Sequence, residues 1–310
     1  MSGRASGAAR AFAARAFAAL VARALGACAP APGKGGEGRL LASASPAPAD
    51  DSTLVLYRFD ETGGARLADS GPQRLDARAG VDTRTEFGRI RNGRRFTRSI
   101  DSFVYLPYRE TLEARAGLTA EAWVYVSAYG QYEATPIVGR WTEAAGEQSW
   151  LFGVLGLDIR PPLASLPGPD FLRIQGVLGV EGKLFFLYQP EEAGSPHVYF
   201  SSETLPLERW THVAVTFDGE LVRFYVGGQL DAQYAVRGRI RPSRAPLLVG
   251  NYFNWRSLTD FGGELRFDPN RDANPYYAFD GVLDDLRLSL TARREFPHAR
   301  YAWEKAPAAP

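Results

Sequence analysis

The fold of this chain is decided by Trp210–Val226, WTHVAVTFDGELVRFYV. Large apolar residues fall on every second position from Val213 to Phe217, and again from Val222 to Val226. Successive side chains of a strand point to opposite faces, so each run presents one apolar face. Asp218-Gly219 lies between the runs, and Asp-Gly in that position is a strong hairpin signal. We therefore predict an antiparallel β-hairpin here.

Short strand-like segments extend over most of the remaining chain. Leu118–Val126 shows the same alternation. Further candidate strands are 54–59, 103–106, 150–155, 172–178, 184–188, 197–201, 247–249 and 282–290. Residues 291–297 are predicted to form at most a short helical turn, and two irregular stretches, 157–171 and 250–278, are predicted to be long loops. Many short strands separated by turn signals indicate an all-β sandwich or barrel, and we expect one such domain over 51–300.

Composition narrows the class of protein. The chain has 310 residues, of which 45% are hydrophobic and 23% charged, which excludes a wholly disordered chain. The formal net charge of +1 lacks the basic excess of a general nucleic-acid binder, so we expect no nucleic acid among its partners. Cys28 is the only cysteine, so neither an intrachain disulfide nor a zinc-binding cysteine cluster can form.

The first fifty residues differ in amino-acid composition from the rest of the chain. An arginine-containing start leads to the apolar stretch AFAALVA at 16–22 and then to LGAC at 25–28. This resembles a bacterial lipoprotein signal, which implies a signal peptide over 1–28 with Cys28 as the lipidated residue. Arg23 interrupts the apolar stretch, and another secretory signal, an organelle transit peptide, a disordered tail and a misassigned start remain as alternatives. Residues 29–50 are predicted to be a Pro/Gly/Ala-rich linker and 301–310 a tail.

Five segments in order resemble a known family. They are LVLYRFDETGGARLADS (54–70), FVYLP (103–107), LTAEAWV (118–124), WTHVAVTFDGELVRFYV (210–226) and FDGVLDDLRLSL (279–290). Together they resemble the laminin-G-like jelly-roll domains of the concanavalin A-like lectin/glucanase superfamily. The resemblance implies an all-β, two-sheet antiparallel jelly-roll sandwich. It also implies carbohydrate or protein partners, often outside the cell and sometimes with calcium.

Catalytic patterns are missing from the sequence. Hydrolytic relatives carry Glu-x-Asp-x-x-Glu on one strand, which puts two carboxylates on one face at the separation needed for glycoside hydrolysis. No such pattern occurs here, and there is no Gly-x-Ser-x-Gly nucleophile elbow. Glu191-Glu192 is interpreted as a solvated turn, and His212 as a structural residue of its strand. We therefore name no catalytic residue and expect that the protein is not an enzyme.

One carboxylate is a candidate metal ligand. Asp284 has the parity of Val282, Leu286 and Leu288, so we expect it on the core side of its strand. A buried carboxylate needs a partner. The family resemblance suggests calcium, with Asp69 and the Ser70 carbonyl as further ligands. The alternative is a hydrogen-bond anchor that ties the last strand to the first loop. The segment Asp268–Asn274 alternates oxygen side chains as calcium loops do, but it lacks the glycine and glutamate of an EF-hand. It is interpreted as a polar turn, with calcium binding as the alternative.

Aromatic and basic residues supply candidate ligand contacts. The 250–278 loop carries a cluster of aromatic residues, and exposed rings give flat platforms to the apolar C–H faces of sugars. Aromatic side chains buried under the loop as a small core are the alternative. Two arginine runs, 84–98 and 237–244, are interpreted as solvated surface, with attraction of an anionic polysaccharide or lipid headgroups as the alternative. The proposed ligand-binding residues are Tyr252, Trp255, Tyr276 and Tyr277.

These observations predict a function class rather than a ligand. We expect a non-catalytic, extracytoplasmic binding module that recognises a glycan or a cell-surface protein. It would be secreted, or attached to a membrane only through a lipid on Cys28. A structural or protein-interaction domain without a sugar site is the alternative. A glycan-active enzyme is less favoured than either.

Overall fold

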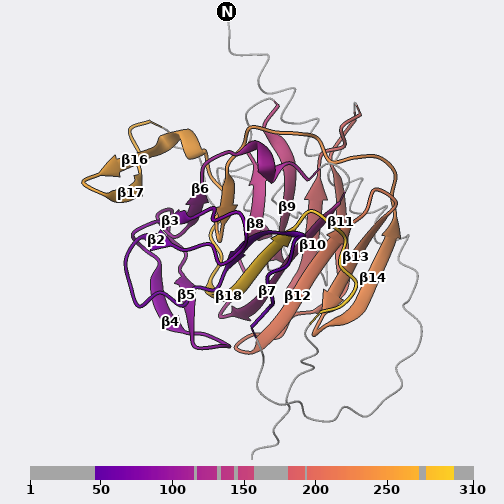
Figure 1. Ribbon diagram of the computed structural model, residues 1–310, viewed down its shortest axis with the longest axis horizontal. Helices are drawn as coiled ribbons and strands as arrows, with labels where there is room; N and C mark the ends of the chain where they lie inside the picture. Colours follow the sequence, from indigo (N-terminus) through magenta and orange to yellow (C-terminus); the bar gives the residue numbers. More distant parts are fainter. Residues whose placement is uncertain are drawn as a thin grey trace, which may run out of the picture.

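Two antiparallel sheets stacked face to face form the body of the molecule. The computed structural model describes residues 46–114, 117–130, 134–142, 146–156, 181–192, 194–271 and 277–296. Each of the two large sheets has eight strands, and a separate two-stranded hairpin projects from one side (Figure 1). In the ranges just given, no helix is long and apolar enough to cross a membrane. The predicted all-β antiparallel sandwich is confirmed.

The first sheet contains the first and the last strand of the fold, β1 and β18. Its order is β14-β13-β12-β7-β18-β5-β4, and β1 also pairs with β18. The predicted hairpin is confirmed as β12 and β13, with Val213 opposite Val226 and Phe217 opposite Val222. The strand bounds are β1 (Thr53–Tyr57), β4 (Arg84–Phe87), β5 (Asn92–Phe96), β7 (Leu118–Val126), β12 (Trp210–Phe217), β13 (Leu221–Val226), β14 (Gln229–Ala235) and β18 (Gly281–Ser289).

The second sheet runs in the order β11-β10-β9-β8-β15-β6-β3-β2. Its strands are β2 (Arg66–Leu67), β3 (Ala77–Ala79), β6 (Val104–Leu106), β8 (Ala134–Trp141), β9 (Gln148–Leu155), β10 (Lys183–Tyr188), β11 (His197–Thr204) and β15 (Leu247–Val249). The projecting hairpin is β16 (Leu258–Phe261) with β17 (Glu264–Phe267). Two 3-10 turns, η1 (Glu110–Leu112) and η3 (Trp255–Ser257), complete the described elements.

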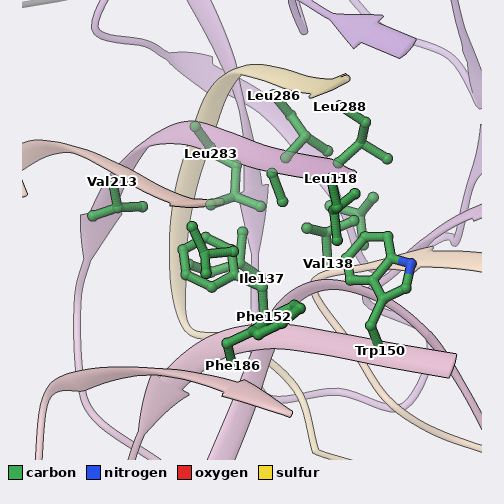
Figure 2. Close-up of a cluster of buried hydrophobic side chains, with 14 of the residues drawn as sticks. Leu118, Ile137, Val138, Trp150, Phe152, Phe186, Val213, Leu283, Leu286 and Leu288 are labelled. Carbon is green, nitrogen blue, oxygen red and sulfur yellow. The ribbon is translucent and has the colours of Figure 1, made fainter. Parts of the chain in front are cut away.

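The main core lies between the two sheets. Figure 2 shows Leu283, Leu286 and Leu288 of β18 on one side of it, with Phe152 and Phe186 of the second sheet on the other. All five side chains are essentially inaccessible to solvent. Fully burying one such side chain contributes about 1.5–3 kcal/mol, so this layer is the main stabilising element of the sandwich.

The outer face of the second sheet is also apolar. Leu151 of β9 and Phe185 of β10 point away from the main core, yet both are buried in a second cluster with Tyr252 and Tyr277. In Trp150–Leu155 of β9 and Leu184–Tyr188 of β10, apolar residues do not alternate with polar ones, as expected of strands that are buried on both faces. This places part of the 250–278 segment over the outer face of the second sheet.

Several expectations about individual segments need correction. The 250–278 segment is not irregular throughout, because it contains η3 and the β16–β17 hairpin. Residues 291–296 form no helical turn. The expected strand 172–178 and the expected loop 157–171 lie outside the described residues. The strands that were not predicted are β2, β3, β4, β5, β8, β14, β16 and β17. Most of these are short or polar, and tertiary pairing rather than local propensity makes them strands.

A β-bulge in β18 overturns the expected orientation of Asp284. Its register slips between Asp284 and Arg287, where Asp285 adopts a left-handed backbone with φ of 46°. Leu283 pairs with the core residue Val124, whereas Asp284 is the partner of Trp123 on the outer face of the first sheet. The parity argument fails because the extra residue of the bulge shifts alternation by one position.

Candidate ligand-binding site

The predicted aromatic platform is largely buried. Tyr252 and Tyr277 are each only 3% exposed, and their ring centroids are 6.1 Å apart. Both pack in the cluster on the outer face of β9 and β10. They therefore form the small core that was the alternative to an exposed platform. Tyr276 lies outside the described residues, which leaves Trp255 as the predicted aromatic with partial solvent access.

Trp255 is held at the start of η3 by polar contacts. The Asn254 side chain caps this turn by accepting a hydrogen bond from the Arg256 amide at 3.2 Å. Trp255 Nε1 donates to Glu147 Oε2 at 3.2 Å, and the ring packs against the cluster that includes Phe253. The Arg256 guanidinium lies over the same ring, 4.8 Å from its centroid.

The Glu147 carboxylate accepts hydrogen bonds from Trp255, Arg256 and Thr142. We call these four residues the Trp255 site. Arg256 donates to both carboxylate oxygens of Glu147, with an Nη1–Oε2 distance of 2.9 Å, and the Thr142 hydroxyl donates to Oε2 at 2.9 Å. Burial alone would raise the pKa of Glu147, but hydrogen bonds from Arg256, Trp255 and Thr142 outweigh it and lower that pKa. The hydrogen bond to Glu147 in turn raises the pKa of Arg256.

The Trp255 site therefore combines an indole with a fixed, charged Arg–Glu pair. Half of the Arg256 side chain is exposed, whereas that of Glu147 is largely buried. A pair of this kind offers donors and acceptors in fixed directions beside an apolar ring, as small-ligand sites do. Sequence reasoning missed Glu147, because it lies 108 residues from Trp255 and no local pattern distinguishes it.

We expect truncation of Trp255 to destabilise the protein much less than truncation of Tyr252. Trp255→Ala should weaken ligand binding while lowering the free energy of unfolding by only about 1 kcal/mol, because its side chain is partly solvated. Tyr252→Ala should lower it by about 3 kcal/mol, because it opens a cavity in a buried cluster. Urea unfolding of both variants, compared with the parent, measures the difference. Equal destabilisation would show that Trp255 is a core residue as well.

Asp69 is engaged by the backbone of the first loop. Its carboxylate accepts hydrogen bonds from the amides of Leu56, Gly71 and Leu75, each at 2.8 Å. Ser70 is tied to the same region, because its amide donates to the Leu56 carbonyl at 2.8 Å. Three N–H hydrogens directed at one carboxylate occupy the positions that a cation would need. Asp69 thus holds the first loop against β1, and these hydrogen bonds do not include the last strand.

Asp284 is buried against a different loop. Oδ2 accepts a hydrogen bond from the Ile90 amide at 2.7 Å, whereas Oδ1 is buried without a hydrogen-bond partner. Burial, to which the nearby carboxylates of Asp285 and Asp60 add, raises the pKa of Asp284 to about 7. Asp284 and Asp69 share no hydrogen-bond partner, because Asp284 binds the Ile90 amide and Asp69 binds amides of the first loop and β1. Over the part of the chain that the structure describes, no group of three or more His, Cys, Asp or Glu side chains is placed to hold a metal.

The other candidate residues have structural surroundings. His212 is 2% exposed, and its Nε2 lies 3.2 Å from Oε2 of the buried Glu121, consistent with the structural role predicted for it. Glu191 and Glu192 are both exposed, as expected of a solvated turn. The first arginine run is not solvated throughout, because Arg94 is buried and Arg95 forms an ion pair with Asp280 at 2.7 Å. Cys28 lies outside the described residues.

Solved structures with a similar fold include domains of bacterial toxins. The binding domain of Paraclostridial Mosquitocidal Protein 1 is 12% identical, with a TM-score of 0.52 over 78% of this chain and 50% of that one. The binding domain of botulinum neurotoxin serotype G is 12% identical, with a TM-score of 0.48 over 78% and 48%. This chain thus spans about half the length of these toxin domains.

A third similar structure is matched over nearly its whole length. It is domain 4 of AbnA, an extracellular GH43 arabinanase from Geobacillus stearothermophilus, in complex with arabinotriose. It is 18% identical, with a TM-score of 0.49 over 79% of this chain and 95% of that one. Comparison with curated protein sequences gives no match. The laminin G model described as "Concanavalin A-like lectin/glucanases superfamily" matches residues 98–267, more than half of the sequence, and this chain therefore belongs to that superfamily.

Proposed function

We propose that this protein is a non-catalytic binding module that recognises a glycan, or a glycan-bearing cell-surface partner, outside the cytoplasm. The observation that carries the proposal is the Trp255 site, where a partly exposed indole lies beside an Arg256–Glu147 pair in fixed geometry. A pyranose has an apolar C–H face and a rim of hydroxyls. The indole edge and the ion pair complement these two features.

The comparisons support a binding role at the level of the family. The superfamily includes lectins, and the mosquitocidal protein with the same fold is represented by its binding domain. The superfamily also includes glucanases, so the fold alone does not decide between binding and catalysis. The absence of the Glu-x-Asp-x-x-Glu pattern from the sequence favours the non-catalytic alternative.

A protein-interaction domain is the second candidate function, and one observation favours it. Phe87, at the end of β4, is 89% exposed, and Phe261, at the tip of the β16–β17 hairpin, is 52% exposed. Large apolar side chains in water are a feature of protein contact surfaces. A Phe87→Ser/Phe261→Ser double variant that loses a cell-surface partner but retains glycan binding would support this second function.

The test of the first function is a glycan array probed with the full chain and with Trp255→Ala. The proposal expects at least one glycan to bind the parent and to bind the variant at least tenfold more weakly. Glu147→Gln is the matched second variant, because it retains the shape of the side chain but removes the charge that fixes Arg256. Parent binding that neither variant changes would refute the Trp255 site.

We further propose that the chain is anchored as a lipoprotein through Cys28, as the LGAC sequence at 25–28 suggests. Cys28→Ser should release the protein from the membrane fraction and remove the mass of the lipid. The proposal is contradicted if the variant stays in the membrane fraction and the parent protein has the mass of the unlipidated chain. Calcium bound at Asp284, whose Oδ1 is buried without a hydrogen-bond partner, is also a proposal, and its test is given in the Discussion.

A further inference from the structure

A row of side chains crosses five adjacent strands on the outer face of the first sheet. In register, Arg84 of β4 is opposite Arg95 of β5, and Arg95 is opposite Val282 of β18. Val282 is opposite Tyr125 of β7, which is opposite Trp210 of β12. These strands lie side by side from left to right in Figure 1. With neighbouring strands about 4.8 Å apart, the row is about 19 Å long.

The row faces away from the main core. Val124 and Val126, which flank Tyr125, both belong to the core cluster, so Tyr125 points outward. Trp210 is its direct partner and therefore shares that face. The two ring centroids are 5.7 Å apart at an interplanar angle of 55°, and both side chains retain partial solvent access. This end of the row, which we call the aromatic end, presents two adjoining rings on a rigid sheet.

The opposite end of the row is basic. The Arg84 side chain is 68% exposed, and its contact with Glu86 at 3.4 Å is between two exposed groups, so it contributes little. Arg95 is fixed by Asp280 at 2.7 Å and by the Ser127 hydroxyl. Like charges placed directly opposite in neighbouring strands destabilise a sheet. Asp280 already offsets the charge of Arg95, whereas the exposed contact with Glu86 leaves the Arg84 guanidinium open to an anionic ligand.

The adjacent row on the same face is covered by other parts of the chain. There Asp284, Trp123 and His212 are successive partners, with the Ile90 amide on Asp284 and the Phe296 ring 5.9 Å from that of His212. Trp123 and His212 are each only 2% exposed as a result. Tyr125 and Trp210 keep partial solvent access, whereas Val282, which lies between Tyr125 and Arg95 in the same row, is only 3% exposed. The row is therefore accessible at its two ends.

We propose that an acidic oligosaccharide binds across the strands along this row. A sugar ring would stack on the aromatic end, and a carboxylate or sulfate would lie at Arg84 and Arg95, where a guanidinium can hold two anionic oxygens at once. Most of the row lies on interior strands, whose backbone groups are already paired, so it does not offer the open edge that an added peptide strand needs. The inference rests on the proposed glycan binding but places this class of glycan on the opposite sheet from Trp255.

The experiment uses the full chain and a panel of uronic-acid and sulfated oligosaccharides, each beside its carboxyl-reduced or desulfated counterpart. The expected result is binding of at least one acidic member, at least tenfold weaker binding of its neutral counterpart, and weaker binding as salt increases. Trp210→Ala and Arg84→Ala should each lower that affinity at least tenfold. Arg84→Ala should leave the melting temperature unchanged or slightly higher, because the side chain is exposed and faces a like charge.

Two controls separate this inference from the proposed function. Arg66→Ala removes an arginine of the second sheet that is even more exposed than Arg84, and it should not change binding of the acidic glycan. Trp255→Ala is measured beside it, because this variant reports on the Trp255 site. Loss of binding in Trp255→Ala but not in Trp210→Ala or Arg84→Ala would overturn the inference and support the Trp255 site. A parent that binds no acidic member of the panel overturns the inference, whatever neutral glycans it binds.

Discussion

Glu121→Ala is expected to lower the free energy of unfolding by about 3–5 kcal/mol. The Glu121 side chain is completely buried on the outer face of the first sheet, where its Oε1 is 2.7 Å from Arg287 Nε. Its Oε2 is 3.2 Å from Nε2 of the buried His212. Removing the carboxylate leaves the Arg287 guanidinium buried without its ion partner, and an uncompensated buried charge is costly. Urea unfolding of parent and variant measures the difference.

The matched control for this prediction is Glu264→Ala on β17. Glu264 also pairs with an arginine, at 2.7 Å from Arg266, but both side chains are about half exposed. Exposed ion pairs contribute about 0–1 kcal/mol, so the control should be nearly neutral. If Glu121→Ala were as mild as Glu264→Ala, the network of Glu121, Arg287 and His212 would not be a stabilising element.

Asp284→Asn is expected to change how stability depends on pH. In the folded protein the pKa of Asp284 is raised from 3.8 to about 7, so the native state holds a proton that the unfolded state has lost. Stability of the parent should therefore fall as pH rises from about 4 to about 7. That interval corresponds to about 4 kcal/mol as an upper limit, and Asp284→Asn should lack this loss. Unfolding of both proteins in chelator at pH 4, 6 and 8 isolates it, because other acids titrate in both.

Calcium supplies the second arm of this experiment. If Asp284 binds calcium, added calcium should restore the stability of the parent at pH 8, by about 2.7 kcal/mol at a hundredfold excess over the dissociation constant. The asparagine variant should not respond. If neither protein responds, calcium binding at Asp284 is refuted and the residue is a structural anchor through the Ile90 amide. Similar stability differences between the two proteins at pH 4 and pH 8 would contradict the raised pKa.

The candidate sites could be predicted from the sequence only in part. Trp255 was singled out because an aromatic in a long loop is a local feature. Its partner Glu147 was not, because that contact spans 108 residues of chain. Tyr252 and Tyr277 looked equally available, yet they are buried against β9 and β10. Exposure depends on what packs over a side chain, and one-dimensional patterns contain no record of it.

Alternation in β7, β12 and β13 determined the sheets, the hairpin and the family resemblance, because a period of two residues is a local property of each strand. The orientation of Asp284 was decided by tertiary structure, since one residue inserted at the left-handed Asp285 reverses the expected faces of Val282 and Asp284 and leaves Leu286 and Leu288 in the core. The row from Arg84 to Trp210 has the same origin. Apart from Arg84 and Arg95, which lie on consecutive strands, its members are far apart in sequence. They become neighbours only because β5, β18, β7 and β12 pair in that order, through backbone hydrogen bonds between distant segments.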